Sequence, residues 1–174
     1  MPILVLEDPP PYEVRALLER RKQSGLHRLD EVWEGILHMV PAPSGEHAYL
    51  AQQLAVFLDG PARAAGLVPA MHEVNVGSSE EDFRIPDGAL HRGIPRDVWY
   101  PTLPLVVEIA SPGDETWQKL PFYAAHGVDE VLVVEPRQRN VHWLMLKDGE
   151  YVEVKRSGLI DLGPDDLLER IDWP

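Results

Sequence analysis

The 174-residue chain contains no cysteine. It therefore has neither a disulfide framework nor a thiolate metal site. No run approaches the roughly 18 uninterrupted apolar residues of a membrane span. The N-terminal segment 1–7 lacks the basic flank and the long apolar stretch of a secretory signal. These absences together favour a cytoplasmic protein.

Several common catalytic signatures are also missing. The seven histidines show no His-x-His or His-Glu-x-x-His spacing, so the sequence offers no usual zinc site. It contains no Gly-rich phosphate loop, and Ser111 lacks the Gly-x-Ser-x-Gly context of a hydrolase nucleophile. The chemistry of this chain has to come from other residues.

Basic residues are scarce. Lys and Arg total 16 against 29 Asp and Glu, which gives a formal net charge of −13. Such a field repels polyanions, so nonspecific duplex binding through a broad basic surface is disfavoured, although a local basic cleft remains possible. Only four of the 16 basic residues are lysines, namely Lys22, Lys119, Lys147 and Lys155.

The remaining pattern is that of a folded α/β protein. An apolar fraction of 44% and this length suit one domain over residues 1–174 with a mixed sheet. Apolar spacing and caps such as Ser44 predict helices at about 12–23, 45–65, 114–126 and 161–168. Pro121 implies a kink or a late start in the third of these. Strands are expected at 67–76, 83–90, 103–110 and 130–135, with hairpins at 31–40 and at 141–147 with 150–155.

The carboxylate of Glu108 lies in the most apolar of these strands, Leu103 to Ala110. That run is short, continuous and rich in β-branched residues, which is typical of a strand buried on both faces. An isolated ionised carboxylate there would lose its hydration at a cost of several kcal/mol. Glu108 is therefore either neutral or paired with a basic side chain or a metal ion.

Asp87 and Lys119 become candidate site residues when they are considered together with Glu108. Pro86-Asp87-Gly88 taken alone is a common turn sequence, and Lys119 taken alone reads as a solvated helix residue. An acid in a turn at a strand edge and an acid in the next buried strand can, however, converge on one divalent cation. Mg²⁺ prefers such oxygen ligands together with water and a substrate phosphate. A lysine on the following helix can orient water or offset charge that develops at phosphorus.

This constellation resembles the PD-(D/E)XK nuclease superfamily and, within it, a bacterial putative restriction endonuclease family formerly known as a domain of unknown function. The resemblance covers about residues 28–155. It depends on a set of short motifs: Glu34-Gly35-Ile36-Leu37, His47, Pro86-Asp87, Val107-Glu108-Ile109-Ala110-Ser111-Pro112, Lys119, Tyr123, Gly127-Val128 and Val133-Val134-Glu135-Pro136.

The resemblance implies a restriction-endonuclease-like fold, with Asp87 and Glu108 as metal ligands and Lys119 as the catalytic lysine. The usual superfamily lysine lies two residues after the second acid, where this chain has Ala110, so Lys119 is a migrated substitute. Where the family usually has an aspartate four residues before that lysine, this chain has Glu115.

Two auxiliary residues complete the candidate site. Glu34 is either a third acid near the metal or a polar residue of the hairpin turn. His47 at the start of the second helix either contacts phosphate or water, or serves as a capping or partly buried histidine.

The implied activity is Mg²⁺-dependent hydrolysis of DNA phosphodiester bonds, with Mn²⁺ as a substitute ion. A homodimer is expected, because two-fold symmetry suits cleavage of both strands and the 141–155 hairpin offers an edge for pairing. Two alternatives remain: a non-catalytic binding or assembly protein with the nuclease fold, and a metal-dependent hydrolase of a small phosphoester.

Overall fold

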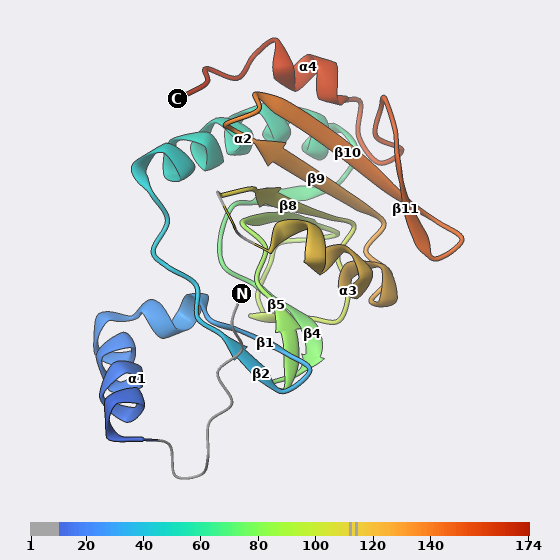
Figure 1. The fold of residues 1–174 in the computed structure, drawn as a ribbon. Helices are drawn as coiled ribbons and strands as arrows, with labels where there is room; N and C mark the ends of the chain where they lie inside the picture. Colours follow the sequence, from blue (N-terminus) through green and yellow to red (C-terminus); the bar gives the residue numbers. More distant parts are fainter. Residues whose placement is uncertain (1–10, 112, 114) are drawn as a thin grey trace.

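The computed structural model describes residues 11–111, 113 and 115–174 (Figure 1). Its helices are α1 (Tyr12–Ser24), η1 (Leu26–Leu29), α2 (Gly45–Ala64), η2 (Thr116–Lys119), α3 (Leu120–Ala125) and α4 (Pro164–Leu168). Its strands are β1 (Glu31–Trp33), β2 (Ile36–His38), β3 (Val68–Ala70), β4 (Asn75–Ser79), β5 (Asp82–Arg84), β6 (Gly88–His91), β7 (Trp99–Tyr100), β8 (Leu105–Ile109), β9 (Glu130–Glu135), β10 (Asn140–Lys147) and β11 (Glu150–Glu153).

A six-stranded mixed sheet, in the order β11-β10-β9-β8-β6-β3, forms the centre of the molecule. β8 and β9 run parallel and every other pair in this sheet is antiparallel. Alternate residues of β8 serve opposite faces. Leu105, Val107 and Ile109 pack with α2 and α4, whereas Val106 packs with Phe122 and Tyr123 of α3. Glu108 lies two positions after Val106, so its side chain is on the same face of the sheet and faces α3.

A smaller five-stranded sheet, in the order β2-β1-β5-β4-β7, lies on the α3 side of the molecule. Arg84 of β5 links it to α3. The Arg84 guanidinium lies 4.2 Å from the ring centre of Trp33 and 4.1 Å from that of Phe122, within the range of cation–π attraction. This packing brings β1 close to the η2–α3 segment.

Two expected strands are each divided between the sheets. The segment 67–76 forms β3 in the large sheet and the start of β4 in the small one, and the segment 83–90 forms β5 and β6 in the same way. Pro86 lacks a backbone N–H and falls at the second break, where ladder pairing stops. Asp87 consequently lies immediately before β6.

The other elements follow the sequence closely. The hairpins, α1, α2, β8 and β9 lie within a few residues of their predicted bounds, and β7 and η1 were not predicted. The third predicted helix starts late, which is one of the two outcomes that Pro121 implied. The short helix η2 comes first, and α3 follows with Pro121 in its first turn. The predicted start at Asp114 lies outside the described residues. None of the helices in the described part of the chain is long and apolar enough to cross a membrane.

Candidate active site

Glu108 is buried, with 3% of its side chain exposed. The Tyr123 hydroxyl donates a hydrogen bond of 2.5 Å to Oε1 of Glu108. Lys119 Nζ donates to both carboxylate oxygens, at 3.2 Å each. The partner that burial required is thus a basic side chain, and a tyrosine hydroxyl assists it.

Lys119 ends η2, directly before α3. Its side chain is 13% exposed and points inward. Besides Glu108, its Nζ lies 2.9 Å from Oε1 of Glu31 and 3.4 Å from the backbone oxygen of Ile85. The lysine therefore connects η2 to strands of both sheets.

Glu31 is a member of this cluster that the sequence reasoning did not identify. Only 2% of the residue is exposed, and its carboxylate also accepts hydrogen bonds from Ile85 N and Trp33 Nε1, both at 2.7 Å. In β1, Glu31 and Trp33 occupy alternate positions on the same face. That alternation was the available signal, but the segment is too short for periodicity to show which face is buried.

Asp87 lies beside Glu108. Its Oδ2 accepts a hydrogen bond of 2.7 Å from the backbone N–H of Ile109, and Gly88 pairs with Val107. Its Oδ1 lies 3.0 Å from Nε2 of His47. Asp87 remains 26% exposed and His47 16%, so this side of the cluster is open to solvent.

His47 lies in the first turn of α2. Ser44 forms the predicted cap, because its side chain accepts a hydrogen bond from the backbone N–H of His47. The start of α2 is thereby fixed next to Asp87, and the imidazole is held against one carboxylate oxygen.

Two other residues from the sequence analysis lie elsewhere. Glu34 is exposed in the turn between β1 and β2, with φ of 49°, and its backbone N–H donates to Asp82. Glu115 pairs with Nδ1 of His38 at 2.7 Å. The structure therefore brings Asp87, Glu108, Lys119 and His47 together, whereas the acid that the first hairpin supplies to the cluster is Glu31.

The cluster contains more negative than positive charge. Burial raises the pKa of Glu108 to about 8; the carboxylates of Asp87 and Glu31 raise it too, while Lys119 and Tyr123 only partly counteract them. Burial lowers the pKa of Lys119, but Glu108 and Glu31 outweigh that effect and hold it above its ordinary value. Lys119 therefore remains an ammonium ion, and one ammonium ion does not fully stabilise the ionised form of Glu108.

The donor set of Asp87 and Glu108 suits a hard divalent cation. Among the described residues, no group of three or more His, Asp or Glu side chains is arranged to hold a metal ion. Mg²⁺ in enzymes usually takes only one or two protein carboxylates and completes its coordination with water and substrate phosphate. Two carboxylates in a site with excess negative charge and one solvent-exposed side fit that pattern.

The family model of Uma2, described as putative restriction endonuclease, matches residues 18–170. The chain belongs to this family. The resemblance inferred from the sequence motifs is thereby confirmed. No curated protein matches the chain.

One solved structure shares the fold. It is the crystal structure of a putative nuclease belonging to DUF820 from Anabaena variabilis ATCC 29413, with a TM-score of 0.65 and 16% sequence identity. The match covers 80% of this chain and 89% of that one. The mixed α/β fold of restriction-endonuclease type is therefore confirmed.

A second solved structure overlaps only in part. It is the cryo-EM structure of a DrdV–DNA complex, with 17% sequence identity and a TM-score of 0.36. The match covers 57% of this chain and 9% of that chain. That TM-score is too low to indicate a shared overall fold.

The raised pKa of Glu108 predicts how the stability of the metal-free protein depends on pH. The ordinary pKa of the carboxyl group is 4.5, so between pH 4.5 and about 8 the folded protein retains a proton that the unfolded chain has lost. Stability should therefore fall as pH rises through this window. Across this pH window, the free energy of unfolding of the wild type should fall by more than about 1 kcal/mol relative to that of Glu108→Gln. One pKa unit corresponds to about this amount of free energy.

Urea unfolding in the presence of a chelator at several pH values measures this difference. The exposed Glu80→Gln is the matched control and should follow the wild type. Equal pH profiles for wild type and Glu108→Gln would show that Glu108 has an ordinary pKa.

Proposed function

We propose that the chain acts as a single domain that hydrolyses DNA phosphodiester bonds with the help of Mg²⁺. The observation that carries the proposal is the contact of Lys119 with Glu108 beside Asp87, in a member of a family described as putative restriction endonucleases. These are the three residues that the resemblance assigned as two metal ligands and a catalytic lysine.

Asp87 and Glu108 would hold the ion, which when bound supplies Lewis-acid polarisation of the phosphate and a more acidic water. The protein's own contribution is electrostatic. Since the pKa of Lys119 is raised, its side chain acts as a fixed positive charge and not as a proton acceptor. A fixed ammonium offsets the negative charge that develops on phosphoryl oxygens in the transition state.

The neighbouring residues hold these groups in place. Glu31 restrains Lys119, and Tyr123 fixes one oxygen of Glu108. Burial and Glu108 raise the pKa of Tyr123 well above its ordinary value, so its hydroxyl stays protonated and remains a donor. His47 and the backbone of Ile109 orient the two oxygens of Asp87. The cluster is thus ordered before substrate arrives, as electrostatic catalysis requires.

Substitution of either proposed metal ligand tests the activity. Asp87→Asn and Glu108→Gln should each reduce Mg²⁺-dependent cleavage of plasmid and single-stranded DNA by about a hundredfold or more, because each removes an anionic ligand. Glu34→Gln should retain activity, since Glu34 is exposed in a turn.

Nicking and linearisation on gels, with Mg²⁺ or Mn²⁺, give the readout, and circular dichroism checks folding. If the purified wild type cleaves no DNA under these conditions, the proposed activity is wrong, and the two alternatives are left: a non-catalytic protein with the nuclease fold and a hydrolase of a small phosphoester.

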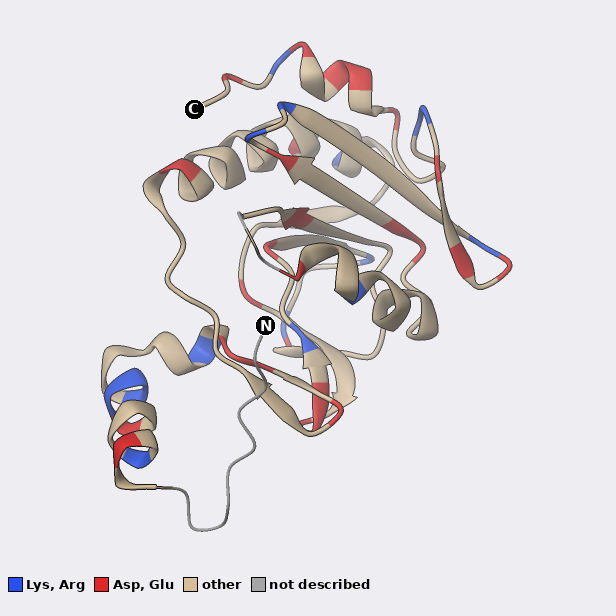
Figure 2. Ribbon diagram, viewed as in Figure 1, with Lys and Arg blue, Asp and Glu red and all other residues tan. Residues whose placement is uncertain are grey.

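A local basic segment offers a route for DNA despite the net charge of −13. Five of the 16 basic residues fall within α1 and η1, namely Arg15, Arg20, Arg21, Lys22 and Arg28 (Figure 2). No residue of α1 is buried. Arg21 pairs with Asp30, the residue next to Glu31, so α1 is attached close to the acidic cluster. We infer that the exposed members contact DNA phosphates.

Replacing Arg15, Arg20 and Lys22 together by Ala should weaken DNA binding by about tenfold and lower its salt dependence, because each phosphate contact contributes about 0.9 to the logarithmic salt slope. Fluorescence anisotropy in a Glu108→Gln background measures binding without cleavage. The control replaces three exposed basic residues elsewhere, Arg63, Lys147 and Lys155. Equal losses in both triple variants would contradict a specific role for α1.

We also propose a homodimer. β11 is an outer strand of the large sheet, and its residue Val152 is 38% exposed, which supports pairing of this edge with a second copy. Light scattering coupled to size exclusion should give twice the chain mass of 19.6 kDa. Val152→Lys should shift the species toward monomer, and a wild type that is monomeric throughout would contradict the proposal.

A further inference from the structure

Trp117 is an exposed tryptophan close to the candidate active site. All five tryptophans lie within the part of the chain that the structure describes, and Trp117 is the only exposed one among them, at 42%. It belongs to η2 and precedes Lys119 by two residues. Tryptophan is on average a largely buried residue, and exposed ones are typical of interfaces. The position of Trp117 therefore points to a role in binding.

Side chains of the large sheet hold the indole in place. Its Nε1–H donates a hydrogen bond of 3.2 Å to Oε1 of Glu135, the last residue of β9. The other oxygen of Glu135 lies 3.0 Å from Nε2 of His142, whose Nδ1 lies 2.9 Å from Oε1 of Glu153. The rings of Trp117 and His142 are nearly perpendicular, with centres 5.1 Å apart. The indole is thus ordered before a ligand arrives, which lowers the entropy cost of binding.

The strand register places this indole anchor near Glu108. β8 and β9 are parallel, and Glu108 pairs with Val133. Glu135 is two residues further along β9, so it lies on the same face of the sheet. With a rise of about 3.3 Å per residue and a strand separation of about 4.8 Å, its Cα lies about 8 Å from that of Glu108. A base next to a phosphate held at the acidic cluster is therefore within reach of the indole.

Two arginines supply positive charge at the same end of the sheet. Arg137 and Arg139 lie in the turn between β9 and β10, shortly after Glu135, and both are exposed (Figure 2). Because β8 and β9 are parallel, this turn lies at the end of the sheet where β8 also ends. Sites for single-stranded nucleic acid combine basic residues for the backbone with aromatic rings for the bases. Trp117 and the two arginines provide both features.

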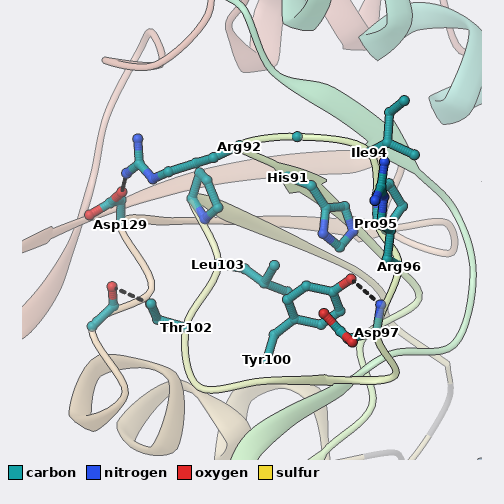
Figure 3. A pocket seen from close by; sticks show the side chains of 13 residues that line it. His91, Arg92, Ile94, Pro95, Arg96, Asp97, Tyr100, Thr102, Leu103 and Asp129 are labelled. Atoms are coloured by element: carbon teal, nitrogen blue, oxygen red, sulfur yellow. Dashed lines mark hydrogen bonds and ion pairs between the residues drawn. The ribbon is translucent and has the colours of Figure 1, made fainter.

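A cavity of about 440 Å³ lies at the opposite end of β6 and β8 (Figure 3). Several groups in its wall already contact one another. The rings of Tyr100 and His91 pack together, with centres 4.9 Å apart. Arg92 pairs with Asp129 at 2.9 Å. The exposed tryptophan, in contrast, is at the same end of the sheet as the acidic cluster.

We propose that Trp117 stacks on an unpaired base of the DNA strand whose phosphate is held at the acidic cluster, and that Arg137 and Arg139 contact neighbouring phosphates. The bases of a closed duplex are stacked on one another and are not available to the ring. The preferred substrate is therefore DNA in which the base beside the cleaved phosphate is unpaired, as in a single strand. This inference rests on the proposed function, because it takes DNA to be bound at the acidic cluster.

Binding of two probes to Glu108→Gln, in which cleavage is disabled, tests the inference by fluorescence anisotropy. One probe is oligothymidylate and the other is a strand of the same length without bases, so both carry the same phosphates. The strand with bases should bind about tenfold more tightly, as expected for stacking of one base. Adding Trp117→Ala should remove this preference. Adding Trp117→Phe should keep most of it, because a flat ring remains.

Tyr49→Ala is the matched control. Tyr49 is also exposed, at 45%, and its hydroxyl also donates a hydrogen bond to a carboxylate, that of Asp172. In the Glu108→Gln background this variant should keep the preference for the strand with bases. A fully paired duplex should bind equally well with and without Trp117→Ala.

Equal binding of both probes by Glu108→Gln would overturn the inference. Equal weakening of both probes, or of duplex and single strand, by Trp117→Ala would also overturn it, because the tryptophan would then act only through the fold.

Replacing Arg137 and Arg139 together by Ala should weaken both probes alike, as expected of phosphate contacts. Unchanged binding would contradict these contacts. A failed stacking test leaves cleavage by the wild type in place, whereas failure of the proposed function appears as absent cleavage. The two failures are therefore distinguishable.

Discussion

The ion pairs of Lys119 hold the candidate site together. One ammonium group contacts Glu31 from the small sheet and Glu108 from the large sheet, while Lys119 itself ends η2. Removing one partner from a buried ion pair typically costs about 3–5 kcal/mol, because the remaining charge is left without compensation. The two sheets and the η2–α3 segment therefore depend on one another, and the site is complete only when all three have folded.

The same contacts compensate the charge of the cluster only in part, and this favours the proposed metal-binding role over a purely structural one. Three carboxylates, Glu31, Asp87 and Glu108, act on a single lysine, and the pKa of Glu108 remains at about 8. A purely structural ion pair would be arranged to balance its charges. A site with excess negative charge, ordered ligand oxygens and one exposed side instead favours a divalent cation and the phosphate that would accompany it.

The sequence predicted the physical basis of the site, but it did not identify every residue that belongs to it. Burial alone required a partner for Glu108, and the family motifs supplied Lys119 and Asp87. Glu31 was missed because its contact with Lys119 joins segments 88 positions apart, and because Glu34 stands in a more conspicuous turn three residues later. The divisions at 67–76 and 83–90 were missed for a related reason: local pattern shows that a segment is extended, but not which of two sheets it joins. Trp117 gave no signal, since only the packed structure shows that its ring is exposed and anchored near the site.

The central claim is that Asp87 and Glu108 form a binding site for a divalent cation next to a lysine that is permanently charged. Calorimetric titration of Mn²⁺ into the wild type, Asp87→Asn, Glu108→Gln and Lys119→Met tests it most directly. The account predicts binding by the wild type, at least equally tight binding by Lys119→Met because a competing positive charge is gone, and loss of binding in both acid variants. If the wild type binds no Mn²⁺ at millimolar concentration, or if Asp87→Asn binds it equally well, the account is contradicted.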